Sequence, residues 1–82
     1  MTADEKFNKI GMVNRGLESI PDYRCIGEGL TEVDFNTPRY IFLGGKDKRI
    51  KEVTIYFYPE EDIDFDDYME AVKTKMKEMG WL

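Results

Sequence analysis

The residues with the greatest potential for chemistry lie in one short stretch, EEDIDFDD, at positions 60–67. Six of its eight residues carry a carboxylate, and none is basic. Carboxylates at this density can hold a divalent cation, complement a basic surface or stabilise the start of a helix. The function that the sequence supports depends on which of these roles the stretch has.

The spacing argues against a calcium site. Asp62, Asp64 and Asp66 alternate as the first three ligands of an EF-hand loop do, but that loop also requires glycine at its sixth position and glutamate at its twelfth. Those two positions hold Asp67 and Lys73. The chain also contains no histidine, the commonest ligand of transition metals. We therefore expect no bound metal and no cofactor.

Stabilising the start of a helix accounts for part of this acidic stretch. Asp62 or Asp64 is expected to cap a helix, because acids in the first turn and lysines toward the end complement the helix macrodipole. Gly80 is expected to end this helix, with Trp81 folding back onto its last turn. The apolar face is predicted from six residues at helical spacing: Phe65, Tyr68, Met69, Val72, Met76 and Met79.

Three or four carboxylates are enough for that purpose, so the others are expected to form an exposed acidic surface. A row of carboxylates imitates a row of phosphates and suits a partner protein with a basic surface. In its sharpest form, this hypothesis describes a small acidic inhibitor of the kind that phages and mobile elements carry, which occupies the nucleic-acid-binding site of its partner. The candidate partner-binding residues are Glu60, Glu61, Asp64, Asp66, Asp67, Glu70, Tyr56 and Tyr58.

The two tyrosines alternate with apolar residues in IKEVTIYFY, at positions 50–58. If Val53, Ile55 and Phe57 pack beneath the helices, Tyr56 and Tyr58 lie on the opposite, open face of the sheet. Aromatic residues on an open face can bind a protein, including a second copy in a homodimer, or stack on bases. We favour the protein interface.

The alternative function is binding of nucleic acid or a nucleotide, through these tyrosines and a group of basic residues. The net charge of −5 weighs against it, since affinity for nucleic acid comes from neutralising phosphates with lysine and arginine. Direct nucleic-acid binding is therefore disfavoured. The basic residues that it would use lie in and just after the loop GGKDKR: Lys46, Lys48, Arg49 and Lys51.

Nothing in the sequence indicates an enzyme. Without histidine, the commonest general base is missing. Cys25, the single cysteine, is expected to be a small core residue and not a nucleophile. Carboxylates on an exposed helix start lack the pocket that acid–base catalysis requires. We expect a non-enzymatic protein with no catalytic residues.

The elements that position these residues are expected to form one α+β domain over residues 1–82. A capping box at Thr2 and Glu5 predicts a helix over residues 3–15. Its apolar face is predicted from residues at helical spacing: Phe7, Ile10, Val13, Leu17 and Ile20.

A three-stranded antiparallel sheet is predicted after this helix. The first strand, over residues 22–33, is expected at an edge, with a bulge at Gly27 and Gly29. Residues 39–44 and 50–58 are expected to form a hairpin, with GGKDKR as its loop. The C-terminal helix is expected to pack on one face of this sheet.

No apolar stretch approaches the length that spans a bilayer, and the N-terminal residues MTADEKFNK lack the apolar core of a signal peptide. We therefore expect a cytoplasmic protein that does not bind membranes.

Overall fold

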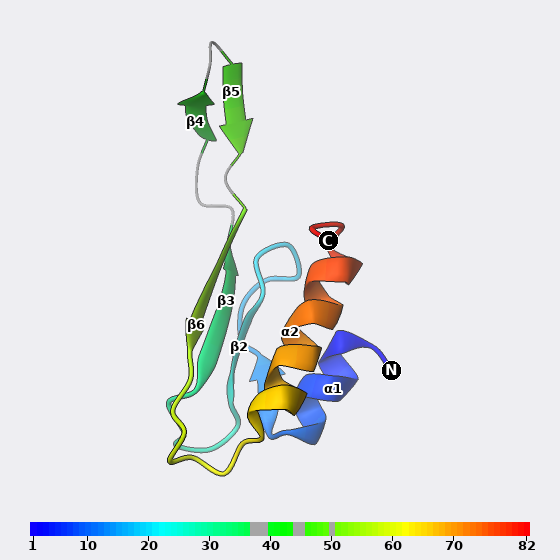
Figure 1. The fold of residues 1–82 in the computed structure, drawn as a ribbon, viewed down its shortest axis with the longest axis vertical. Helices are drawn as coiled ribbons and strands as arrows, with labels where there is room; N and C mark the ends of the chain where they lie inside the picture. The colour runs from blue at the N-terminus through cyan, green and yellow to red at the C-terminus, as the bar shows by residue number, and fades with distance from the viewer. Residues whose placement is uncertain (37–39, 44–45, 50) are drawn as a thin grey trace.

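The computed structural model describes residues 1–36, 40–43, 46–49 and 51–82. Both helices lie on the same side of the main sheet (Figure 1), so the predicted α+β class is confirmed. The elements are α1 Ala3–Lys9, β1 Met12–Asn14, β2 Asp22–Cys25, β3 Glu32–Asn36, β4 Tyr40–Leu43, β5 Lys46–Arg49, β6 Glu52–Tyr56 and α2 Phe65–Glu78.

The main sheet has four antiparallel strands in the order β1-β2-β3-β6, and the prediction of three strands is wrong. The additional strand, β1, lies within the segment that was expected to continue the first helix. The two outer strands of this sheet are therefore β1 and β6.

The first helix is much shorter than the predicted 3–15. It begins as expected, with the capping box of Thr2 and Glu5 in place. It ends at Lys9 because Gly11 adopts a φ of 84°, in the left-handed region that favours glycine. The chain then reverses into β1, where Met12 is fully buried.

The apolar residues beyond this point do not share a helix face. Val13 lies in β1 opposite Arg24 of β2. Leu17 and Ile20 follow in the connection to β2 and are 64% and 39% exposed. Helical spacing in the sequence therefore does not reflect helical structure here.

The predicted bulged edge strand over residues 22–33 is also wrong. The segment forms two strands, β2 and β3, which pair with each other, and Tyr23 lies opposite Val33. The glycines belong to the turn between these strands. A Cβ added at Gly29 would lie 2.6 Å from the Sγ atom of Cys25, so a larger residue at this position would require the Cys25 side chain to shift.

The predicted hairpin of 39–44 with 50–58 is wrong in its pairing. β6 pairs with β3, with Asn36 opposite Glu52. β4 pairs instead with β5, with Tyr40 opposite Arg49, so Lys46–Arg49 is a strand and not a loop. These two strands form an arm beyond the end of the main sheet (Figure 1), and the molecule measures 46 × 24 × 21 Å.

The C-terminal helix confirms its predicted boundaries. The Asp64 side chain caps it by accepting a hydrogen bond from the backbone N–H of Asp67. At the other end Gly80 has a φ of 75°, and the N–H of Trp81 donates to the carbonyl of Met76 at 2.8 Å. This is the predicted Schellman ending.

The core lies between the helices and the main sheet. The Phe7 ring of α1 stacks on the Tyr23 ring of β2, with 3.8 Å between their centroids. Val53 of β6 and Phe57, just after β6, pack against the core as predicted, whereas Ile55 is 40% exposed. The buried apolar residues are Ala3, Phe7, Met12, Tyr23, Val33, Phe35, Tyr68, Ala71 and Val72.

In the part of the chain that the structure describes, neither helix combines the length and the apolar character that crossing a bilayer requires.

Candidate functional site

The start of α2 and the connection before it carry the exposed carboxylates. We call Glu60, Asp62, Asp66 and Asp67, together with Phe65 between them, the acidic helix start. All four acids are exposed, and none forms an ion pair with another residue among those described. Their negative charge is therefore not neutralised within this part of the molecule.

Phe65 is the apolar member of this surface. It was predicted to belong to the buried face of α2, but its side chain is 52% exposed. One side of the Phe65 ring is held in place, because this ring contacts the Phe57 ring at a centroid distance of 5.0 Å. An aromatic side chain that is half exposed and held on one side can insert into a pocket on a partner at little cost in entropy.

Asp64 and Glu70 complete the predicted surface, but both already have intramolecular roles. Asp64 is the N-cap of α2. Glu70 forms an ion pair with Lys6 of α1 at 3.0 Å, and this cation lowers the pKa of the Glu70 carboxyl. The Lys6 ammonium also donates to the Thr74 hydroxyl at 2.9 Å, which ties α1 to α2.

Glu61 differs from its neighbours, because its carboxylate is engaged inside the fold. It accepts hydrogen bonds from the backbone N–H groups of Leu30 at 2.6 Å and Thr31 at 2.8 Å, and from the Thr31 hydroxyl at 2.5 Å. The Thr31 hydroxyl, and next the Leu30 N–H, lower the pKa of Glu61. Glu61 therefore holds the β2–β3 turn against the segment that precedes α2.

Of the two candidate tyrosines, Tyr56 lies away from the acidic helix start. Tyr56 is 47% exposed and lies opposite Glu32. Since side chains alternate along a strand and Val53 faces the core, Tyr56 lies on the sheet face away from the helices. Tyr58 is partly buried, and its backbone N–H donates to the Thr31 hydroxyl at 3.3 Å.

The basic candidates are described only in part. Lys51 is exposed. Lys46, Lys48 and Arg49 belong to β5, where the structure describes the backbone but not the side chains.

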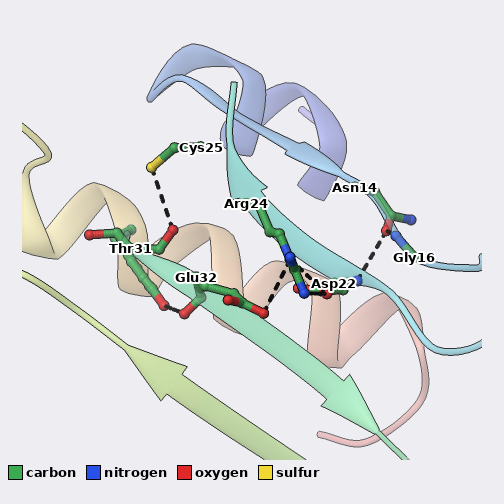
Figure 2. Close-up of polar contacts among 8 residues, drawn as sticks. Asn14, Gly16, Asp22, Arg24, Cys25, Thr31 and Glu32 are labelled. Carbon is green, nitrogen blue, oxygen red and sulfur yellow. Dashed lines mark hydrogen bonds and ion pairs between the residues drawn. The ribbon is translucent and has the colours of Figure 1, made fainter. Parts of the chain in front are cut away.

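A group that the sequence did not reveal lies on the open face of the sheet. Asp22 and Asp34 are directly opposite each other on β2 and β3, and Arg24 is opposite Glu32. Figure 2 shows the Arg24 guanidinium reaching both Asp22, at 2.9 Å, and Glu32, at 3.3 Å. Carboxylate oxygens of the three acids lie within 4.8 Å of one another.

Among the described residues, no cation pairs with Asp34. Burial, followed by hydrogen bonding to Asp22 and Glu32, raises the pKa of Asp34 to about 7. Burial also opposes ionisation of Asp22, but hydrogen bonds with Asp34 and Arg24 outweigh it and lower the pKa of Asp22. Asp34 is therefore partly protonated near neutral pH, whereas Asp22 and Glu32 both pair with Arg24.

Replacing Asp34 with asparagine is expected to stabilise the protein at pH 8. There Asp34 is ionised opposite Asp22, and removing its charge is expected to raise the free energy of unfolding by about 1 kcal/mol, since solvent screens part of the repulsion. At pH 5 the folded wild type already holds a proton on Asp34 that the unfolded chain has released, so the wild type loses stability as the pH rises from about 4 to 7.

The measurement is urea unfolding of wild type and Asp34→Asn at pH 5 and pH 8. Glu52→Gln, an exposed change on the same sheet face, is the control. An equal stability difference between wild type and Asp34→Asn at the two pH values would contradict this assignment.

Two other chemical roles, metal binding and nucleophilic catalysis, receive little support from the described residues. The three carboxylates are close enough to share a cation, but Arg24 already forms ion pairs with Asp22 and Glu32. Cys25 is partly buried, and burial, followed by the nearby charge of Glu61, raises the pKa of its thiol. A thiol with a raised pKa is a poor nucleophile at neutral pH.

Comparison of the chain with protein-family models, with curated proteins and with solved structures gives no match. The function must therefore be argued from the surfaces described above.

Proposed function

We propose that this protein is a non-enzymatic protein-binding module, and that the acidic helix start is its binding surface. One observation carries the proposal: Phe65 is 52% exposed on the first turn of α2, among carboxylates that have no ion-pair partner in the described chain. The partner would offer an apolar pocket surrounded by lysine and arginine.

The support comes from what such a surface does in a complex. A few residues in desolvated pockets, aromatic side chains prominent among them, typically contribute most of the binding energy at an interface. Surrounding charges of one sign accelerate the encounter with a partner of opposite sign and exclude wrong partners. Here the Asp64 cap and the Phe57 contact hold the surface in place before binding. Glu61 is not part of this interface, because its carboxylate is occupied by Leu30 and Thr31.

In the more specific form of the proposal, the basic site on the partner is one that binds nucleic acid, and the protein acts as its inhibitor. Carboxylates spaced along a helix start present negative charge much as successive phosphates do. Nucleic acid would then compete with this protein for the partner.

A second candidate is a nucleic-acid binder that uses the arm. It is favoured by one observation, that Lys46–Arg49 forms β5 of an arm extending beyond the main sheet (Figure 1). The net charge of −5 and the unpaired acids of the acidic helix start argue against it.

The test is photo-crosslinking from position 65. Phe65 is replaced with p-benzoylphenylalanine, a phenylalanine analogue that crosslinks to neighbouring molecules on illumination, and the control carries it at Leu17, which is 64% exposed at another site. In a source-cell lysate, position 65 is expected to yield one protein adduct that position 17 does not. A nuclease-sensitive adduct would instead support the second candidate, and no adduct specific to position 65 would contradict the proposal.

A further inference from the structure

The outer edge of β6 has backbone groups that pair with no strand in the described chain. Their direction follows from two hydrogen bonds. The N–H of Phe35 donates to the Pro21 carbonyl on the β2 side, and the N–H of Tyr58 donates to the Thr31 hydroxyl on the β3 side. Because these directions alternate along a strand, the N–H and C=O groups of Val53 and Ile55 point outward.

The two outer strands of the sheet differ in how they are protected. The outer strand β1 is only three residues long, and the residue just before it, Gly11, has a positive φ. β6 is five residues long, and its sequence, EVTIY, contains no proline or lysine and one charged residue, Glu52, at its first position. Proline, charged side chains (lysine above all) and short strand length are the usual protection against edge-to-edge pairing. β6 is therefore the edge that is open to another strand.

Exposed apolar side chains accompany these free backbone groups. Ile55 is 40% exposed on the helix face of β6, and Tyr56 is 47% exposed on the other face. A strand added beside β6 would cover both of them and satisfy the outward groups of Val53 and Ile55. The edge thus offers main-chain hydrogen bonds and apolar contacts together.

The sequence of β6 is complementary to itself. In an antiparallel pair of β6 strands with a two-fold axis at Thr54, Val53 of each copy faces Ile55 of the other, and Glu52 faces Tyr56. All five residues of the strand find a partner, no like charges face each other, and the outward groups of Val53 and Ile55 form the hydrogen-bonded pairs. We propose that two copies of this chain associate in this way, joining their two main sheets into one.

This interface is separate from the acidic helix start, and salt affects the two in opposite directions. Each copy carries a net charge of −5, so screening favours association of the copies. Binding of a basic partner would be weakened by the same change. A failure of either proposal can therefore be distinguished from a failure of the other.

The first test is sedimentation of the purified protein between about 5 and 500 μM, at low and high salt. The expected result is a monomer–dimer equilibrium that shifts toward the dimer in high salt. Ile55→Lys is expected to weaken dimerisation at least tenfold, whereas Leu30→Lys, at a residue that is 64% exposed outside β6, is expected to leave it unchanged. A wild type that stays monomeric, or a dimer indifferent to Ile55→Lys, would overturn the proposal.

The register has its own test, which does not depend on the stability of the lysine variant. Facing Thr54 residues would form a non-hydrogen-bonded pair with about 4.5 Å between their Cα atoms, a spacing that a disulfide can bridge. In a Cys25→Ser background, Thr54→Cys is expected to form a covalent dimer on mild oxidation. The matched variant Glu52→Cys, whose two copies would lie several residues apart, is expected to stay largely uncrosslinked. Equal crosslinking of both variants would overturn the register.

Discussion

Replacing Glu61 with alanine is expected to lower the free energy of unfolding far more than the same change at Glu60. The substitution removes an ionised acceptor from three hydrogen bonds, given by the N–H groups of Leu30 and Thr31 and by the Thr31 hydroxyl. Thr31 is only 1% exposed, so its freed groups are not simply resolvated. Hydrogen bonds to charged groups contribute roughly 1.5–3 kcal/mol each and are not additive when they share one acceptor.

Glu60→Ala is the matched control, because Glu60 is adjacent and exposed and forms no ion pair within the described chain. Urea unfolding at pH 7 is expected to show a change within about 0.5 kcal/mol for this variant. The Glu61 contribution also has a pH signature. Its pKa is lowered in the folded state, so the contribution is complete above the usual pKa of glutamate and is lost as the pH falls through the folded-state value. Equal stabilities of the two variants would show that Glu61 does not hold the turn.

The contrast between Glu60 and Glu61 shows what the sequence could not reveal. Both belong to one acidic run, and their side chains differ only in whether the β2–β3 turn comes within hydrogen-bonding distance. That turn was itself not predicted, because the glycines of residues 22–33 suggested a bulge in one strand. A contact between positions 30 and 61 depends on tertiary structure, which the local pattern does not contain.

The elements that were predicted correctly are those with local signals. The capping box at Thr2 and the cap at Asp64 depend on residues within one turn, as does the Gly80–Trp81 ending. β1 was missed because its apolar residues also fit a helical spacing, and only the reversal at Gly11 distinguishes the two. This segment forms a strand and not a helix because it pairs with β2.

The carboxylate group on the open sheet face was missed for a related reason. Asp22 and Asp34 lie twelve positions apart in the sequence, and they meet only because β2 and β3 pair in one particular register. A shift by one residue would place one of them on the helix face. Had residues 22–33 been recognised as part of a hairpin, the alternation of charged residues, Asp22 and Arg24 in one strand and Glu32 and Asp34 in the other, would have predicted the group.

Lysine at positions 66 and 67 is expected to weaken binding of the protein partner at least 100-fold. The two substitutions change the local charge by four units and place like charges against a basic surface, which costs several kcal/mol; a 100-fold loss corresponds to about 2.7 kcal/mol. Lysine is unfavourable in the first turn of a helix by about 0.3–1 kcal/mol per residue. The Asp64 cap is retained, so α2 is expected to remain folded.

The matched control is Glu18→Lys with Glu52→Lys, which changes the net charge equally at two exposed positions. Glu18 lies in the connection between β1 and β2, and Glu52 is the first residue of β6. Circular dichroism and urea unfolding of both double variants establish that any difference in binding arises from the surface and not from the fold.

The most direct test of the binding role is capture of partners from a nuclease-treated lysate of the source cells, at low and at high salt. The wild type, Asp66→Lys/Asp67→Lys and Glu18→Lys/Glu52→Lys are compared. At low salt, the wild type and the control are expected to retain one protein in stoichiometric amount. High salt and Asp66→Lys/Asp67→Lys are each expected to release it. Retention of that protein by Asp66→Lys/Asp67→Lys, or the capture of none by the wild type, would contradict the proposal that the acidic helix start binds a partner.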